Sequence, residues 1–404
     1  CEKRAGVEHD FEKDGLDLII RDGRLTANGT TLGGDNGVAV ALMLMVLDDD
    51  EIEHPPVECV FTTEEEVGLN GAKALDKSVL KARTMINMDS EDEGVATVSC
   101  AGGLRVQFTK EIQRTTVQGS LLTLKVEGLL GGHSGQDIDK ERQNADLLMA
   151  RMIQRLLKET KGQLVSFNGG TKDNAIPREC EASLIYESDE EAAKAEELAC
   201  ELAETYAEDL TPAEPDFSCE ISCETNRTAE AIPQDAAKEF ICAMRLAPNG
   251  IQKRNIKMDG FVVVSLNLGV VRTEEDRIVM IFSPRSSVAS LQEDTKERLN
   301  TLAETFGFTV SHSSEYPGWS FKEDSPVREI CKESYKELFG EDLKIEAIHA
   351  GLECGLFSDA IKGLDAIAIG PTIANCHTPD EYLTLDSFER FYEFLKDILS
   401  RLAK

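Results

Sequence analysis

The chain has 404 residues, of which 41% are apolar, so it is long enough for two or three domains with hydrophobic cores of their own. Its 75 acidic residues outnumber its 43 basic ones, and the net charge of −32 argues against nucleic acid and anionic membranes as partners. Eleven cysteines without a Cys-x-x-Cys pair, and no apolar run of the roughly 20 residues that span a bilayer, lead us to expect a cytoplasmic protein.

The first hundred residues alternate short apolar runs with one apolar helix pattern. An Asp-Gly turn signal separates residues 16–20 from residues 25–27, which predicts a β-hairpin. We predict one helix and two buried strands after it, at residues 38–47, 57–63 and 84–88. Because strands alternate with helices, we expect a parallel or mixed α/β sheet, with ligands bound beyond the carboxyl ends of its strands.

From about residue 104 the pattern changes to strand-like runs between amphipathic helices, which predicts one or two small α+β sandwiches of ferredoxin-like type, inserted into the first domain. The predicted strands of this insertion are residues 121–126, 164–167, 183–186, 261–271 and 277–282. Its predicted helices are residues 142–157, 190–207, 236–245 and 291–306. Near residue 308 the chain returns to the first domain, where the predicted elements are helices 326–338 and 387–402 and strands 345–349 and 365–369.

Carboxylates stand at the ends of three predicted elements, and one histidine lies in a turn-rich stretch near the C-terminus. Asp35, between glycines, precedes the first helix. Glu65 and Glu66 follow one strand, and Asp89 follows another. Together with His377 they offer carboxylate and imidazole donors, which suit zinc, cobalt or manganese, whereas calcium prefers oxygen alone. A dication keeps crowded carboxylates ionised, so we predict a metal site, with solvated strand ends as the alternative.

Nine segments, taken in chain order, are similar to the successive motifs of the M20 metallopeptidases. They are residues 31–37, 63–68, 87–92, 131–135, 173–179, 284–287, 316–319, 349–355 and 376–380. Each motif alone is weak, but the ordered set covers nearly the whole chain. Within the family, the chain resembles most the aminoacyl-histidine dipeptidases, which are cytosolic non-specific dipeptidases of the peptidase D type.

The resemblance implies an α/β fold: a zinc-peptidase-type mixed sheet flanked by helices, with an inserted ferredoxin-like α+β lid of two subdomains. The catalytic domain would comprise residues 1–103 and 313–404, and the lid residues 104–312. Relatives carry a His-x-Asp motif upstream of the position that Cys1 matches, and its histidine binds the second ion. We therefore expect the sequence to lack the first strand and helices of the catalytic domain, together with one metal ligand.

The resemblance also implies two divalent metal ions, zinc in the first place with cobalt or manganese as alternatives. Asp35 would bridge the two ions, with a cis peptide bond to the next residue. Glu66 and His377 would bind one ion, and Asp89 would bind the other. Glu65 would stay free of metal and act as the general base.

Four further residues match positions that contact substrate in relatives. They are His133, Asn174, Arg285 and His349. His133, on the lid, would help to stabilise the oxyanion, and Arg285 would bind the carboxylate of a dipeptide. The alternatives are that the histidines are ordinary loop residues and that Arg285 is a surface ion-pair partner.

The implied activity is metal-dependent hydrolysis of dipeptides, of the Xaa-His type or with broad specificity, by a water that the two ions activate. Other M20 activities stay open, namely a tripeptidase, a carboxypeptidase or an N-acyl amino-acid deacylase, and so does an inactive relative that binds peptides. We expect dipeptides as partners, no nucleic acid and no membrane, and a possible homodimer, since relatives form dimers through the lid.

Overall fold

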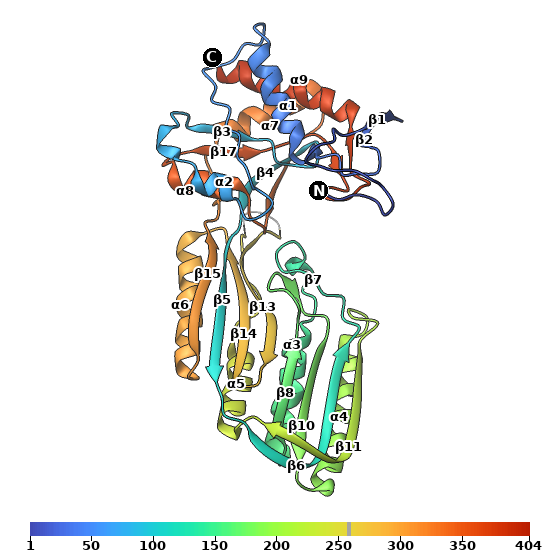
Figure 1. Ribbon diagram of the computed structural model, residues 1–404. Helices are drawn as coiled ribbons and strands as arrows, with labels where there is room; N and C mark the ends of the chain where they lie inside the picture. The colour runs from blue at the N-terminus through green and yellow to red at the C-terminus, as the bar shows by residue number, and fades with distance from the viewer. Residues whose placement is uncertain (257–259) are drawn as a thin grey trace. The chain divides into compact units, whose positions relative to one another are not determined.

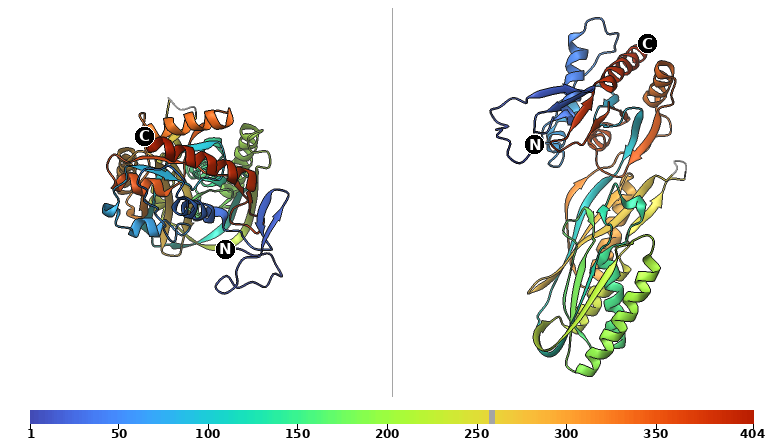
Figure 2. Two further views of the ribbon diagram at one scale, coloured as in Figure 1. Left: turned by 90° about the horizontal axis from the view of Figure 1, so that it is seen from above. Right: turned by 90° about the vertical axis from the view of Figure 1, so that its right-hand side faces the viewer.

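The computed structural model describes residues 1–256 and 260–404 (Figure 1). These residues form two compact units. The first unit comprises residues 1–100, 318–347 and 352–404, and the second comprises residues 101–317 and 348–351. Both ends of the chain therefore lie in the first unit, as Figure 2 also shows. None of the helices in the described parts of the chain is long and apolar enough to cross a membrane.

The first unit contains a four-stranded mixed sheet in the order β16-β4-β17-β3. The strands are β3 (Thr84–Asn87), β4 (Val95–Cys100), β16 (Lys344–Ile348) and β17 (Asp365–Ala368). Strand β17 is parallel to β3 and antiparallel to β4. In Figure 1, helices lie on both sides of this sheet, namely α1 (Gly34–Asp48), α2 (Asn70–Ala74), α7 (Pro326–Phe339), α8 (Glu353–Ala360) and α9 (Leu385–Leu402). The predicted mixed sheet flanked by helices is thus confirmed.

A second small sheet of the first unit joins the two ends of the chain. Its order is β1-β2-β19-β18, and its strands are β1 (Leu18–Arg21), β2 (Arg24–Ala27), β18 (Ile373–Ala374) and β19 (Tyr382–Thr384). The predicted hairpin is confirmed: Asp22 and Gly23 form its two-residue turn, with φ values of 50° and 72°. Since β19 pairs with β2, residues near 380 lie beside residues near 25.

The predicted strand at residues 57–63 is wrong. This segment pairs with no strand in the part of the chain that the structure describes, and Phe61 is 50% exposed. The three glutamates after it do not end a strand. They lie in a turn, in which Glu64 has a φ of 56° and the backbone N–H of Gly71 donates to the carbonyl of Thr63 over 2.8 Å. None of residues 57–63 is buried, so both the strand and the burial that the apolar run predicted are wrong.

The second unit contains one continuous sheet, and the pairs of strands within it are antiparallel. The strand order is β11-β6-β10-β8-β13-β14-β5-β15, and β12 pairs with β13. The strands are β5 (Gly102–Glu111), β6 (Thr115–Glu127), β8 (Gln163–Gly169), β10 (Cys180–Tyr186), β11 (Ser218–Ala231), β12 (Gly250–Arg254), β13 (Val262–Thr273), β14 (Arg277–Ser286) and β15 (Thr309–Tyr316). The helices are α3 (Ala145–Glu159), α4 (Asp189–Leu210), α5 (Gln234–Leu246) and α6 (Ala289–Thr305).

An extensive hydrophobic core lies within the second unit. It contains side chains from all four helices and from the strands on either side of the β8–β13 junction. Helix α3 shows why: Met149, Met152, Ile153 and Leu156 follow the helical spacing and are fully buried, and Asn144 caps the helix by accepting from two backbone N–H groups. The two α+β halves are therefore joined edge to edge into one sheet, and side chains of both contribute to this core.

Four short elements complete the description of residues 1–256 and 260–404. Strands β7 (Gly132–His133) and β9 (Ala175–Ile176) form a small antiparallel sheet in the second unit. Two 3-10 turns are η1 (Lys77–Val79) and η2 (Ile138–Lys140). In this small sheet His133 pairs with Ala175, which directly follows Asn174.

Candidate active site

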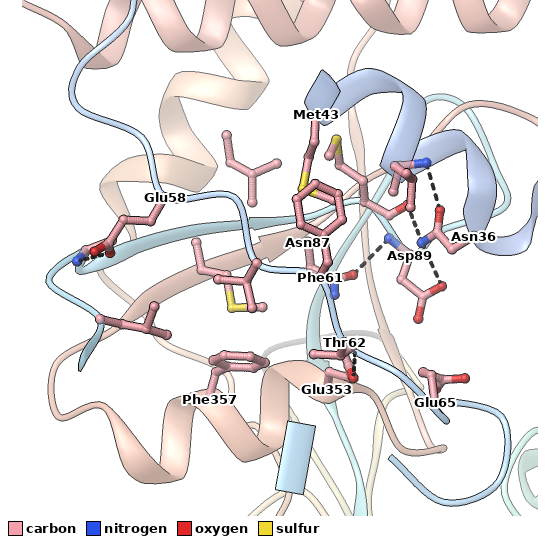
Figure 3. A pocket seen from close by; sticks show the side chains of 18 of the residues that line it. Asn36, Met43, Glu58, Phe61, Thr62, Glu65, Asn87, Asp89, Glu353 and Phe357 are labelled. Carbon is pink, nitrogen blue, oxygen red and sulfur yellow. Dashed lines mark hydrogen bonds between the residues drawn. The ribbon is translucent and has the colours of Figure 1, made fainter. Parts of the chain in front are cut away.

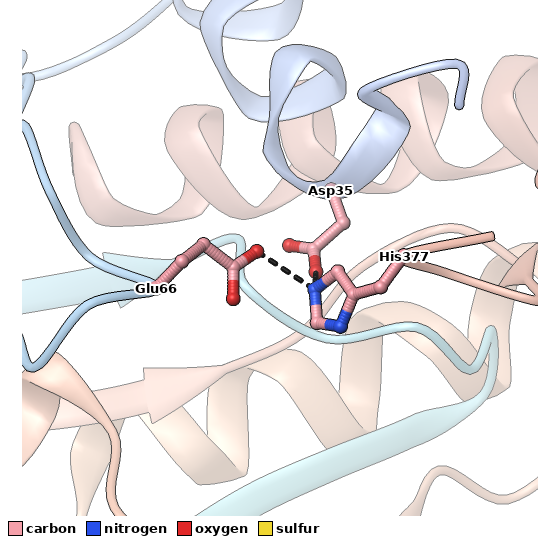
Figure 4. A group of neighbouring side chains, drawn as sticks. All are labelled: Asp35, Glu66 and His377. Atoms are coloured by element: carbon pink, nitrogen blue, oxygen red, sulfur yellow. Dashed lines mark hydrogen bonds and ion pairs between the residues drawn. The ribbon is translucent and has the colours of Figure 1, made fainter. Parts of the chain in front are cut away.

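Three side chains from distant segments of the first unit meet at one point (Figure 4). Asp35 lies at the start of α1, Glu66 in the turn before α2, and His377 between β18 and β19. The Nε2 atom of His377 is 3.2 Å from an Asp35 oxygen and 2.7 Å from a Glu66 oxygen. One donor atom from each of the three lies within 4.8 Å of the others, which is the arrangement that a shared metal ion requires.

Asn36 connects the Asp35 segment to the end of β3. The Asp35–Asn36 peptide bond is cis, as the family resemblance implied. The Asn36 side chain accepts from the backbone N–H of Ala39 over 3.0 Å and so caps the regular part of α1. Its amide nitrogen donates to the carbonyl of Met88 and to a carboxylate oxygen of Asp89, both over 3.1 Å. This contact places Asp89 next to the group of three.

Asp89 lies deeper than Glu66 and His377, and its surroundings disfavour a negative charge. Burial raises the pKa of Asp89 to about 7, and the charges of Asp35 and Glu65 add to the effect. The pKa of Asp35 is raised as well, first by burial and then by the charge of Glu66. Without an added positive charge, the ionised forms of both carboxyl groups are therefore disfavoured.

Glu65 is not one of the three converging donors, and it lines a cavity of about 500 Å³ together with Asp35, Glu66 and Asp89 (Figure 3). Burial raises its pKa to about 7, with further contributions from the charges of Glu66 and Glu353. Glu353 itself accepts from the hydroxyl of Thr62 over 2.8 Å. A carboxyl group with a pKa near neutrality takes up and releases a proton readily at physiological pH, which is what a general base does.

The residues present fit a divalent metal ion. An imidazole nitrogen with carboxylate oxygens is a donor set that zinc, cobalt and manganese accept. The carboxyl groups of Asp35, Glu65 and Asp89 all have raised pKa values, first by burial and then by neighbouring negative charges. His377 offsets this only in part: burial lowers its pKa, but Glu66 and Asp35 together raise it. A dication supplies the missing positive charge.

Sequence reasoning missed two residues beside this group. Glu91 and Cys376 offer donor atoms that lie within 4.8 Å of each other and of an Asp35 oxygen. Burial, followed by the charges of Glu91 and Asp35, raises the pKa of the Cys376 thiol to about 12, so that it stays protonated. Their positions, two residues after Asp89 and one before His377, were the available signal.

The four residues predicted to contact substrate all belong to the second unit. Arg285 and His349 are 7% and 8% exposed. An Nη atom of Arg285 donates to the hydroxyl of Tyr316 over 3.1 Å, and the Nε2 atom of His349 lies 2.7 Å from the hydroxyl of Ser265. Among the described residues, Arg285 Nε and His349 Nδ1 have no hydrogen-bond partner. A buried guanidinium with an unpartnered Nε–H group is suited to an incoming anion.

Burial, together with the nearby charge of Arg285, disfavours the charged form of two histidines. The pKa of His349 is lowered to about 3, first by burial and then by the charge of Arg285. The pKa of His133 is lowered by the same two causes in the same order. The Nδ1 atom of His133 accepts from the backbone N–H groups of Gly135 and Gln136 over 3.2 and 3.0 Å, so its Nε2 carries the proton and is free to donate.

Asn174 lies beside His133 through the backbone. Strand β7 pairs His133 with Ala175 of β9, and the N–H of Ser134 donates to the carbonyl of Asn174 over 2.9 Å. Asn174 is exposed. The structure therefore brings all four of these predicted residues to one part of the second unit.

Comparison with known proteins identifies the family of this chain. The family model for peptidase family M20/M25/M40 matches residues 6–401. The cytosol non-specific dipeptidase of Escherichia coli strain K12 is 34% identical over 99% of this chain and 83% of its own length. The crystal structure of aminoacylhistidine dipeptidase from Vibrio alginolyticus has a TM-score of 0.94 at 34% identity, over 99% of this chain and 82% of that one. The aminopeptidase PepT of Bacillus cereus, with a TM-score of 0.51 and 16% identity over 98% of this chain and 78% of that one, shares the fold.

The family match spans nearly the whole chain, and it includes every residue whose geometry is described above. The resemblance stated from the ordered motifs is thereby confirmed. This chain belongs to peptidase family M20/M25/M40.

Proposed function

We propose that this protein is a metal-dependent dipeptidase that hydrolyses dipeptides of the Xaa-His type or a broader range. The observation that carries the proposal is the convergence of Asp35, Glu66 and His377 on one point, with Glu65 beside them on the wall of a cavity. The two relatives that are 34% identical to this chain are both named as dipeptidases, which supports the same substrate class here.

Two divalent ions, zinc in the first place with cobalt or manganese as alternatives, complete the proposed site. Asp35 would be shared by the two ions, Glu66 and His377 would hold one of them, and Asp89 would hold the other. When bound, such ions activate a water molecule at neutral pH and polarise a carbonyl oxygen. The contact from Asn36 to Asp89 supports this assignment, because it ties the second carboxylate to the segment that carries the bridging one.

Glu65 is the proposed general base. It takes the proton from the attacking water and passes it to the nitrogen of the leaving amine. Its pKa of about 7 in the metal-free protein supports this role, since the group changes its protonation state close to the working pH. Its neighbour Glu66 points to His377 instead, so that the two adjacent glutamates divide metal binding and proton transfer between them.

The group around Arg285 is the proposed substrate-binding site. Arg285 binds the carboxylate of the dipeptide, and His133 donates a hydrogen bond from Nε2 to the oxyanion. Asn174 and His349 contact the substrate beside them. The unpartnered Nε of Arg285 supports its role, because it can donate to the substrate carboxylate. The lowered pKa values of both histidines support theirs, because a neutral imidazole donates a hydrogen bond and leaves Arg285 as the charged partner of that carboxylate.

A cytoplasmic location and a homodimer complete the proposal. All eleven cysteines are free, and the Escherichia coli relative is named as a cytosolic enzyme, which supports the location. The homodimer is a prediction that sedimentation of the purified protein tests.

Substrate profiling of the purified protein tests the proposed function. We expect zinc to support hydrolysis of dipeptides such as Ala-His and Ala-Ala, and we expect a chelator to abolish it until metal is restored. Tripeptides, carboxypeptidase substrates and N-acetyl amino acids serve as controls. Faster turnover of one of these control classes would move the protein to another activity of the family, and binding without turnover of any of them would indicate an inactive relative.

A further inference from the structure

Glu381 is a buried carboxylate that binds a backbone loop instead of a cation. It is 2% exposed and follows His377 by four residues. One of its oxygens accepts from the backbone N–H groups of Leu32 and Gly33 over 2.8 and 2.9 Å. The other accepts from those of Gly34 and Asp35 over 2.8 and 3.3 Å. Four consecutive N–H groups thus converge on a single side chain.

The loop is shaped for this carboxylate. Gly33 has a φ of 69°, in the left-handed region that favours glycine, and this conformation helps consecutive N–H groups to face the same way. At Gly34 a Cβ atom would lie 3.2 Å from a Glu381 oxygen, closer than ordinary van der Waals contact. Concave arrangements of backbone N–H groups bind anions in many proteins. Here the anion belongs to the same chain.

The other end of Glu381 is tied to the turn that carries His377. The N–H of Glu381 donates to the carbonyl of Thr378 over 3.1 Å, and the N–H of Thr378 donates to the carbonyl of Asn375 over 3.2 Å. Within this turn His377 has a φ of 62°, which is uncommon for a residue other than glycine. The backbone hydrogen bonds of the turn stabilise this conformation of His377. The side chain of Glu381 connects the turn to the loop that ends in Asp35.

We propose that Glu381 is a positioning residue for the metal site. It holds the loop of Asp35 and the turn of His377 at the separation at which both side chains reach one ion. The inference rests on the proposed function, because it takes the group of Asp35, Glu66 and His377 to be a metal site. Glu66 lies in a separate turn, before α2. Loss of Glu381 would therefore let Asp35 and His377 move relative to each other and relative to Glu66.

The substitution Glu381→Gln tests the proposal. Glutamine keeps the size of the side chain, but it has one acceptor oxygen, and its NH₂ group faces two of the four N–H donors. We expect the affinity for zinc, measured against a competing chelator, to fall by about 10–100-fold, as for other side chains that orient metal ligands. We also expect the visible spectrum of bound cobalt to change, since the spectrum reports the arrangement of the donors.

Glu214 provides a matched control. It is also 2% exposed, and its carboxylate accepts from the backbone N–H groups of Leu130 and Gln143 over 2.7 and 2.9 Å, within the second unit. Glu214→Gln should lower the melting temperature yet leave zinc affinity and the cobalt spectrum unchanged. If both variants weaken zinc binding alike, the effect is general destabilisation and the proposal is wrong.

A second variant covers the case in which Glu381→Gln does not fold. Gly34→Ala leaves Glu381 in place and puts a methyl group against its oxygen, so we expect a smaller loss of zinc affinity in the same direction. Folded Glu381→Gln, or folded Gly34→Ala in its absence, with the zinc affinity of the parent protein overturns the inference while the proposed function stands. A parent protein that binds no zinc, cobalt or manganese overturns the proposed metal site itself, and the positioning role with it.

Discussion

The replacement of Glu65 by glutamine tests the division of work between two adjacent glutamates. The side chain keeps its size but loses the carboxyl group whose pKa is raised to about 7, by burial first and then by the charges of Glu66 and Glu353. An amide cannot take up the proton, and general acid–base groups contribute about 10²–10⁴-fold to catalysis. We therefore expect kcat to fall by that factor, which corresponds to about 3–5 kcal/mol of activation free energy.

Metal binding should survive the same replacement. The donor atoms that lie within 4.8 Å of one another belong to Asp35, Glu66 and His377, and Glu65 is not among them. Its charge also helps to raise the pKa of Asp89, so that its removal makes Asp89 easier to ionise. The zinc content of the variant should equal that of the parent protein.

The assay is hydrolysis of a dipeptide at saturating zinc, with the metal content of the same samples measured in parallel. Glu64→Gln is the matched control, because Glu64 belongs to the same triplet but is exposed and accepts from the amide of Asn70 over 3.0 Å. We expect the control to stay within about twofold of the parent, as for an ordinary surface substitution. A Glu65 variant that keeps most of its activity would refute the assigned base, and one that loses its zinc would make Glu65 a ligand.

Three further outcomes follow from the same geometry. His377→Ala should lower zinc affinity by at least about 100-fold with little change in the melting temperature of the metal-free protein, and unchanged affinity in equilibrium dialysis would remove His377 from the ligands. The metal-free protein should become more stable as the pH falls from 8 towards 5. The reason is that the pKa values of Asp89 and Glu65 in the folded protein are about 7, above their ordinary values. The stability gained by protonating them is lost as the pH rises through 7. Saturating zinc should flatten that dependence, and a melting temperature that rises with pH without metal would contradict the reasoning. Arg285→Met should raise KM for dipeptides far more than it changes KM for the same dipeptides with an amidated C-terminus. Equal effects on both would show that Arg285 does not bind the carboxylate.

Local features of the chain were predictable because their causes are local. The Asp-Gly turn between two apolar runs specifies the β1–β2 hairpin without help from distant residues. The helical spacing of apolar residues likewise predicted α3 and α9 to within a few residues. The ordered motifs identified the family, and with it the kinds of side chain that form the candidate site.

Whether a segment forms a strand, and how far a sheet continues, depends on neighbouring strands that are distant in the sequence. Residues 57–63 have the composition of a buried strand but no strand beside them among the described residues, so they stay unpaired. The ferredoxin-like pattern of the insertion left one or two sandwiches open. The register of Val271 against Gly169 joins its halves into one sheet, and the sequence pattern does not express this pairing.

The site itself belongs to the tertiary structure, because electrostatic and hydrogen-bond energies depend on distances that only the folded chain sets. His377 and Glu66 are 311 positions apart, yet their side chains lie 2.7 Å from each other. The raised pKa values of Asp89 and Glu65 arise from burial among other carboxylates, which residue type alone does not predict. The sequence motifs assigned no role to Glu381, and the proposed role rests on the four backbone N–H groups that donate to its carboxylate. The sequence named the chemical groups, and the fold decided which of them act together.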